Sequence, residues 1–249
     1  MPRKWILAAI GGGGTAGPEV EAFGRLVAHV GAILMTGGVP KQNSSAVTER
    51  AQFGCKAAGG PMISVLPNKD SNEIVRCPGE RRFEVRTTTS KYGRDPITGA
   101  AADMIFVFPG EVGTFVELAY ASKEGRPIVF CGTEAQWKEM NSDRQKNSSA
   151  IRKGIETAVR EYGPDFENGA LTPNQVTQTA DRLEHDLNQA LQQINQGTIA
   201  HFLQSFPQVS IPPTPAGTNF RGLPDCSGIE DFRRLVDELS AFGPNGCFP

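Results

Sequence analysis

Short apolar runs alternate with segments of helical spacing through the first half of the chain. Each run has the length and composition of a strand that is buried on both faces. Strands that alternate with helices in this way predict a parallel sheet with right-handed crossovers. The five runs are residues 5–10, 32–36, 62–66, 104–108 and 128–131.

The segments between these runs predict the helices that connect them. Apolar residues recur at helical spacing after Pro18, which suits a first helical position. Pro96 is likewise expected at the opening of its helix. The helices are predicted over residues 18–30, from Ser44 or Ser45 to 58, 96–101 and 114–124, with a short fourth strand over 83–87. We therefore predict an α/β fold, a Rossmann-like doubly wound parallel sheet with helices on both faces.

A run of four glycines directly follows the first predicted strand. The order strand, glycine loop, helix, strand is a nucleotide-binding pattern, and a flexible turn into a helix is the less favoured alternative. Thr15 stands in the register of the third glycine of the dinucleotide fingerprint GxGxxG, and no acidic residue ends the second strand. Classical NAD binding is therefore disfavoured. The candidate phosphate-binding residues here are Gly11, Gly12, Gly13, Gly14 and Thr15.

A second glycine-containing turn follows the apolar run 104–108. Glycines allow the backbone to approach a phosphate, and the start of the next helix offers free N–H groups. Glu117 is expected in the first turn of that helix, from which it can point back over the same crevice. It then either complements the helix dipole or takes part in chemistry. The candidate binding residues of this turn are Pro109, Gly110, Glu111, Val112, Gly113 and Thr114.

Residues 109–117, PGEVGTFVE, resemble the PGGxGTxxE motif of the LOG family. These are cytokinin-activating nucleoside-monophosphate phosphoribohydrolases, often mislabelled lysine decarboxylases. The segment is similar also to the related molybdenum-cofactor carrier proteins, which share the Rossmann-like fold. The resemblance covers roughly residues 3–140. Glu111 departs from the family, because it stands where the motif has its second glycine and adds a negative charge at a phosphate site.

The resemblance also implies a catalytic pair. LOG-like enzymes use the motif glutamate together with an arginine on the helix before the motif strand. Glu117 matches the glutamate directly, and Arg94 matches the arginine by its spacing from Asp103. Without the resemblance, Arg94 is equally a surface arginine beside an aspartate. The family's second phosphate loop is reduced here to Gly37 and Gly38.

Composition narrows the class of protein further. The net charge of −2 gives no electrostatic argument for nucleic acid or membrane binding. The expected partner, a small-molecule nucleotide, is indicated by the glycine turns and implied by the resemblance. Five scattered cysteines form no CxxC pair and no Cys/His cluster, so we predict no metal site and no required cofactor. The apolar run at the start is too short for a signal peptide, and no run approaches the length of a membrane span. A cytoplasmic protein is expected.

The composition changes near residue 141 and becomes richer in Gln, Asn and Ser. We divide the chain into a Rossmann-like nucleotide-binding domain, 1–140, and a mostly α-helical C-terminal extension of unknown role, 141–249. Helices are predicted over 151–162, 176–194 and 228–242. The second of these has one apolar stripe, which must pack on the first domain or on another subunit. We expect a homodimer or higher homo-oligomer, and we interpret His185 and His201 as surface or packing residues.

Three functions remain open on the sequence. The first is hydrolysis of the N-glycosidic bond of a nucleoside 5′-monophosphate, with Arg94 and Glu117 as the catalytic residues. The second is a non-catalytic carrier of a nucleotide or of the molybdenum cofactor, which Glu111 and the reduced second loop favour. The third is a nucleotide-sensing domain, for which the length of the C-terminal part is the only support.

Overall fold

The fold is described from a computed structural model of the chain. The residues that it describes are 4–12, 16–37, 46–67, 81–87, 89–131, 134–162 and 171–195. The predicted helix over 228–242 lies outside these residues, as does His201.

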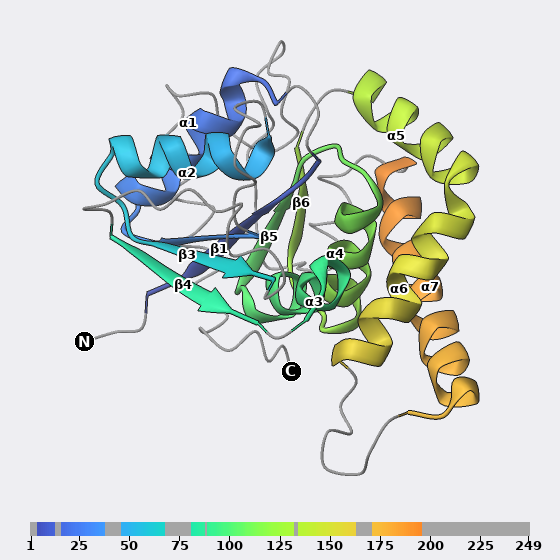
Figure 1. Cartoon of the computed structure of the whole chain (residues 1–249). Coiled ribbons are helices and arrows are strands. Elements are labelled where there is room, and N and C mark those ends of the chain that lie inside the picture. Colours follow the sequence, from blue (N-terminus) through green and yellow to red (C-terminus); the bar gives the residue numbers. More distant parts are fainter. Residues whose placement is uncertain are drawn as a thin grey trace.

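Six parallel strands form a single sheet in the order β4-β3-β2-β1-β5-β6 (Figure 1). Each predicted strand is present, with ends shifted by no more than one residue. Val107 pairs with Ile10, so the segments that follow β5 and β1 leave the sheet at the same edge. The chain order reverses between these two strands, and such a switch point is where open α/β sheets bind ligands. The strands are β1 (Ile6–Ile10), β2 (Ile33–Thr36), β3 (Met62–Leu66), β4 (Arg82–Arg86), β5 (Met104–Val107) and β6 (Ile128–Phe130).

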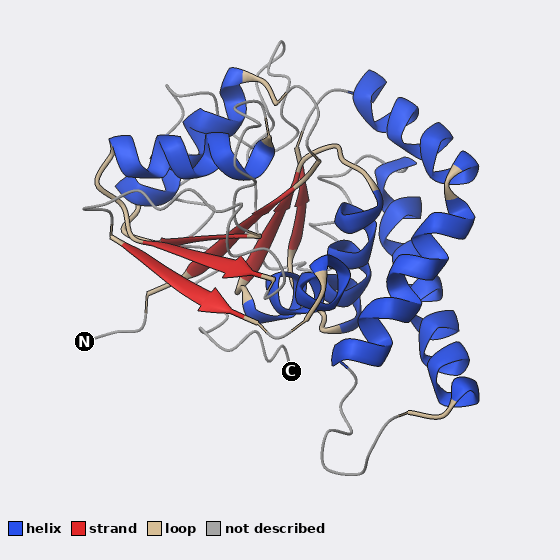
Figure 2. Cartoon of the chain, in the orientation of Figure 1, coloured by secondary structure: helices blue, strands red, loops and turns tan. Residues whose placement is uncertain are grey.

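Helices cover both faces of the sheet, as predicted (Figure 2). On one face, α1 (Pro18–His29) and α2 (Val47–Ala57) pack on alternate strand residues such as Leu7 and Phe106. On the other face, α3 (Lys91–Ala101) and α4 (Val112–Lys123) lie over the intervening residues, among them Ile105. The predicted Rossmann-like α/β fold is therefore confirmed.

Two helices differ from the prediction in ways that matter for the site. Helix α3 begins five residues before Pro96, with Ser90 as its N-cap, so this proline lies inside the helix and not at its opening. The Ser90 hydroxyl accepts a hydrogen bond from the Gly93 N–H (3.3 Å), which outweighs the proline as a start signal. Helix α4 begins at Val112, and Glu117 consequently lies in its second turn, not its first.

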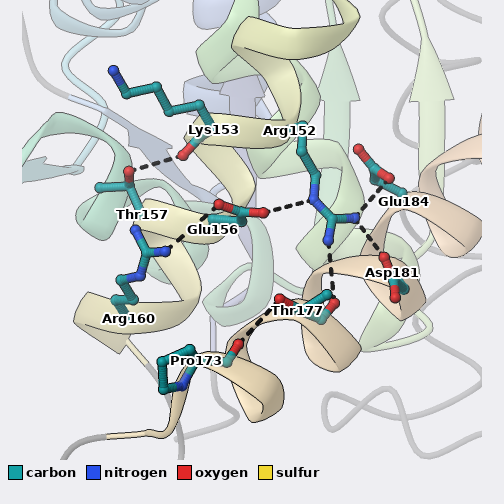
Figure 3. Close-up of polar contacts among 9 residues, drawn as sticks. All are labelled: Arg152, Lys153, Glu156, Thr157, Arg160, Pro173, Thr177, Asp181 and Glu184. Atoms are coloured by element: carbon teal, nitrogen blue, oxygen red, sulfur yellow. Dashed lines mark hydrogen bonds and ion pairs between the residues drawn. The ribbon is translucent and has the colours of Figure 1, made fainter.

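The C-terminal helices pack on the same face as α4. The helices are α5 (Glu134–Lys146), α6 (Ser148–Tyr162) and α7 (Pro173–Asn195), and α5 was not predicted. The apolar stripe of α7, from Val176 to Leu191, is buried in the same cluster as β5 and α4, so it packs on this chain's own core. Arg152 on α6 joins that helix to α7 through Asp181 and Glu184 (Figure 3).

Candidate functional site

The glycine turns after β1 and β5 are in direct contact. The Gly12 N–H donates a hydrogen bond to the Pro109 carbonyl (3.2 Å). A Cβ on Gly110 would lie 2.4 Å from the Gly12 nitrogen and 2.1 Å from Thr114 Oγ1, which leaves no room for a side chain. The sequence predicted that these turns flank a phosphate. The structure brings them together at the switch point, and the Gly12 N–H already has a backbone acceptor.

The start of α4 supplies the free N–H groups of the site. The first N–H groups of a helix lack intrahelical partners, and here these belong to Val112 and Gly113. Glu111 is the N-cap residue, but its exposed side chain accepts no capping hydrogen bond. Thr114 is buried beside Gly110. This helix start can bind an anion, and Glu111 adds a negative charge next to it.

Arg94 lies at the same edge of the sheet, over the ends of β2 and β3. Its Nη1 donates to the Val65 carbonyl (3.2 Å), and its Nε donates to Asp95 Oδ1 (3.2 Å). A Cβ on Gly37 would lie 2.9 Å from Arg94 Nη2, so the glycine after β2 makes room for the guanidinium. With 14% of its side chain exposed, Arg94 is not a surface arginine.

Two carboxyl groups are buried between α3 and α4. Asp95 is 1% exposed and Glu117 is 6% exposed. Burial raises the pKa of Asp95 to about 6, even though Arg94 and Lys91 lower it. Burial first, and the negative charge of Asp95 second, raise the pKa of Glu117 well above its ordinary value. The effect of a helix dipole fades within the first turn, so it is a minor influence on Glu117 in the second turn.

A third carboxylate holds the start of α3. Glu161 Oε2, on α6, accepts hydrogen bonds from the Ser90 N–H and from the Ser90 hydroxyl, both at 2.7 Å. The negative charge lies at the positive end of the helix that carries Arg94, where it is favourable. The C-terminal part of the chain therefore fixes the helix that positions Arg94.

Most of the predicted site residues meet at one edge of the sheet. Gly11, Gly12, Gly37, Pro109, Gly110, Glu111, Val112, Gly113 and Thr114 all follow a strand's carboxyl end or begin α4. Arg94 and Glu117 approach the same edge from α3 and α4. The predicted residues Gly13, Gly14, Thr15 and Gly38 lie outside the described part of the chain.

A cavity of about 370 Å³ lies on the α1 and α5 side of this turn. It is lined by Gly12 and Gly110, and also by Glu19, Glu111, Glu139 and Asp143. None of the described residues that line it is a lysine or an arginine. Such a cavity disfavours a phosphate, so the more suitable side for an anion is the one that Arg94 occupies.

Asp95 is the site residue that the sequence analysis missed as a functional group. It was treated only as a neighbour of Arg94. Lys91, Asp95 and Gly99 recur at four-residue spacing, so they share one face of α3, and this face meets α4 at Gly99. A glycine on one face of a helix indicates close packing of that face. An acidic residue on the same face, as Asp95 is, could therefore have been recognised as buried from the sequence. In the described part of the chain, no group of three or more His, Cys, Asp or Glu residues could hold a metal ion.

Comparison with known proteins decides the family. A sequence profile of the SLOG cluster4 family matches residues 4–159, more than half of the chain. The chain belongs to the SLOG cluster4 family. The predicted LOG-like resemblance is thereby confirmed, and the match continues past residue 140 into α6. No curated protein matches this SLOG cluster4 chain.

Solved structures similar to this SLOG cluster4 chain include two proteins described as binding or carrying the molybdenum cofactor. The molybdenum cofactor binding protein of Rippkaea orientalis is 26% identical, with a TM-score of 0.47, over 58% of this chain and 86% of that one. The molybdenum cofactor carrier protein of Chlamydomonas reinhardtii is 27% identical, with a TM-score of 0.42, over 58% and 87%. Among the described residues, no helix is long and apolar enough to span a membrane.

Proposed function

We propose that this protein hydrolyses the N-glycosidic bond of a nucleoside 5′-monophosphate, releasing the base and ribose 5-phosphate. The observation that carries the proposal is the meeting of Arg94 and Glu117 at the carboxyl edge of the sheet. They come from different helices and are both largely buried, and the charge of Arg94 lowers the pKa of Glu117, which relates the two groups electrostatically. Membership of a LOG-like family agrees with this chemistry.

Each charged part of the substrate is expected to meet a site group of complementary charge. The start of α4, with Val112 and Gly113, suits the 5′-phosphate, because helix N-termini bind anions. Arg94 provides a fixed cation that orients the phosphoribosyl group or the leaving base. Glu117 acts at the sugar's C1′, where positive charge develops as the bond to the base breaks. No cofactor is required for this reaction.

The test is incubation of the full chain with a panel of nucleoside monophosphates, followed by chromatography for free base. We expect at least one of them to be cleaved, and the matching nucleoside without phosphate to be cleaved much more slowly. Glu117→Gln is the matched variant, and it should bind the nucleotide while losing turnover. If no member of the panel yields free base although the protein binds nucleotides, the hydrolase proposal is wrong.

A non-catalytic carrier of a nucleotide or of the molybdenum cofactor is the second candidate. The observation that favours it is Glu111, an exposed N-cap whose charge weakens phosphate binding at α4. A carrier also has no need of turnover, so a weaker phosphate contact is less costly. Nucleotide binding without release of base, by both the wild type and Glu117→Gln, would identify this function.

A further inference from the structure

Helices α3 and α4 are in close backbone contact at the level of Glu117, and the charge of Asp95 acts on the Glu117 carboxyl group by raising its pKa. A Cβ on Gly99 would lie 2.3 Å from the Glu117 carbonyl oxygen, so the two helix backbones are close at this level. One turn nearer the site, a Cβ on Gly113 would lie 3.1 Å from Asp95 Oδ2. The Asp95 carboxylate therefore lies against the first turn of α4, on the helix that carries Glu117.

The two oxygens of Asp95 have different surroundings. Oδ1 accepts the hydrogen bond from Arg94 Nε, at 3.2 Å. Oδ2 is buried and has no hydrogen-bond partner among the described residues. An unpartnered buried carboxylate oxygen costs free energy unless a donor reaches it. A protonated Glu117 is such a donor, whereas an ionised Glu117 would add repulsion at the same place.

The charged groups around the pair decide which of the two carries the proton. Arg94 contacts Asp95 directly, and Lys91 is on the same face of α3, one turn earlier. Both lower the pKa of Asp95 and that of Glu117, but among the described residues only Asp95 forms an ion pair with one of them, Arg94. The direct contact favours the charge on Asp95. On α6, which packs against α3, Glu161 accepts hydrogen bonds from the Ser90 N–H and hydroxyl at the start of α3. Because Glu161 is itself negatively charged, it does not favour ionisation of Glu117.

We propose that Asp95 and Glu117 act as one carboxyl pair that holds a single proton at neutral pH, with the charge on Asp95 and the proton on Glu117. This inference rests on the proposed function and specifies it. Glu117 starts the reaction as an acid, and Asp95 is the positioning residue that keeps it protonated. Like-charged carboxyl groups that share a site commonly hold one proton between them.

The reaction then balances with Glu117 and one water. The C1′–N bond breaks with its electron pair on the base nitrogen, and that nitrogen takes the proton from Glu117. The resulting Glu117 carboxylate lies beside the cationic sugar carbon and stabilises it. The oxygen of a water molecule adds to C1′, and its proton returns to Glu117. The products are the protonated base nitrogen, ribose 5-phosphate and the original acid.

The test is a carboxyl titration of the full chain, labelled with ¹³C at Asp and Glu carboxyl carbons, by NMR between pH 4 and 9. Asp95→Asn and Glu117→Gln assign the two signals, and the amide oxygen that Asp95→Asn introduces can still accept from Arg94. In the wild type we expect a protonated Glu117 and an ionised Asp95 at pH 7. Asp95→Asn should lower the titration midpoint of Glu117 by about one pH unit, because a neighbouring negative charge is removed.

Two further variants keep the test decisive. Glu124→Gln removes an exposed charge at the far end of α4, where Glu124 pairs with Lys123, so it should leave the midpoint of Glu117 unchanged. Lys91→Met should raise that midpoint, because a favourable positive charge is lost, and it serves if Asp95→Asn does not fold. The proposed pair is wrong if Glu117 is ionised at pH 7 in the wild type. It is also wrong if neither Asp95→Asn nor Lys91→Met changes the titration midpoint of Glu117.

Turnover separates this inference from the proposed function. If a nucleotide is cleaved, the loss of kcat/KM at high pH reports ionisation of the acid, and Asp95→Asn should shift it to lower pH. If the titrations reveal the pair but no nucleotide is cleaved, the hydrolase proposal fails and the pair stands. If a nucleotide is cleaved but Asp95 and Glu117 both titrate at the ordinary pKa values of carboxyl groups, the pair is wrong and the hydrolase proposal stands.

Discussion

Glu117 and Asp95 show how much of a side chain's chemistry depends on its surroundings. The motif places a glutamate at position 117, but only the packing of α3 on α4 shows that it is buried beside a second carboxyl group. The same holds for Arg94, whose spacing suggested a role while its hydrogen bonds to Val65 and Asp95 fix its orientation. Sequence identifies these residues as candidates, and long-range contacts determine their charge.

Glu117→Gln should change how stability depends on pH. Burial and the charge of Asp95 raise the folded-state pKa of Glu117 well above its unfolded value. The folded state therefore binds this proton more tightly, and the wild type loses stability as pH rises through the window between the two pKa values. Glutamine has no proton to lose, so the variant should gain stability relative to the wild type across that window, by up to ~1.4 kcal/mol per pH unit.

Urea denaturation at pH 5, 6, 7 and 8 measures this difference. Glu84→Gln is the control, because its shift has the opposite sign and lies below pH 4.5, so its stability difference from the wild type should stay constant from pH 5 to 8. Burial alone would raise the pKa of Glu84, but hydrogen bonds and charges from Arg82 and Arg86 hold it below its ordinary value. Its contribution is present above the unfolded pKa and is lost as pH falls through the folded one. A stability difference between Glu117→Gln and wild type that is constant with pH contradicts the argument.

Glu111→Gly should strengthen binding of the nucleotide's phosphate. Glu111 is the exposed N-cap of α4, so its charge opposes an anion at that helix start. Removing it should improve the affinity for a nucleoside monophosphate about two- to fivefold at low salt, an effect that screening reduces at higher salt. Isothermal titration calorimetry at two salt concentrations measures this, with Glu124→Gly at the far end of α4 as the control. Unchanged or weaker binding would place the phosphate elsewhere.

The elements of the fold were largely predictable because hydrophobic periodicity is a local property. Five of the six strands appear as apolar runs, β4 being the exception, and the stripe on α7 predicted its buried face. Helix α5 was not predicted because its thirteen residues are mostly polar and bury only a few side chains, Trp137 and Met140 among them. The start of α3 was misplaced because the Ser90 cap and the Glu161 contact outweigh Pro96, and the second of these joins residues distant in the sequence.

Gly99→Ala should uncouple the two helices that form the site. Its Cβ would lie 2.3 Å from the Glu117 carbonyl oxygen, so α3 must move away from α4. We expect a loss of stability of about 1–3 kcal/mol and, since Arg94 and Glu117 lie on opposite sides of this contact, a fall in nucleotide turnover of tenfold or more. Chemical denaturation and the release of free base measure the two effects.

Gly24→Ala is the matched control. Its Cβ would lie 2.0 Å from the Ala51 carbonyl oxygen, at the equally tight contact between α1 and α2. This variant should lose a similar amount of stability but keep its kcat, because Arg94 and Glu117 keep their relative positions. Equal losses of kcat in both variants would show that general destabilisation, and not the geometry of α3 on α4, is responsible.

The C-terminal helices belong to the same packed body as the sheet's second face, and this gives them a role in holding the site. Residues of α6 and α7 share one hydrophobic cluster with α4 and β5. Glu161 of α6 caps the helix that carries Arg94. Neither connection is visible in the local sequence, because each joins segments that are distant along the chain.

Arg152→Gln should loosen α7 from the rest of the molecule. The Arg152 guanidinium donates to Glu156 (2.9 Å), Asp181 (2.7 Å) and Glu184 (2.9 Å), and also to the Thr177 carbonyl (3.3 Å) (Figure 3). Without it, three carboxylates face one another across α6 and α7. We expect the free energy of unfolding to fall by about 1–3 kcal/mol, because a network with one central cation contributes more than an isolated surface pair.

Arg160→Gln is the control for this last prediction. Arg160 is on the same helix, but 59% of its side chain is exposed and it pairs only with Glu156, at 3.6 Å, among the described residues. Its loss should cost less than about 0.5 kcal/mol. Hydrogen exchange locates the effect, since Arg152→Gln should speed exchange in α7 before it does so in β1 or β5. If exchange rises equally throughout the sheet and α7, then the helix unfolds only together with the whole chain, and Arg152 does not hold a separate unit.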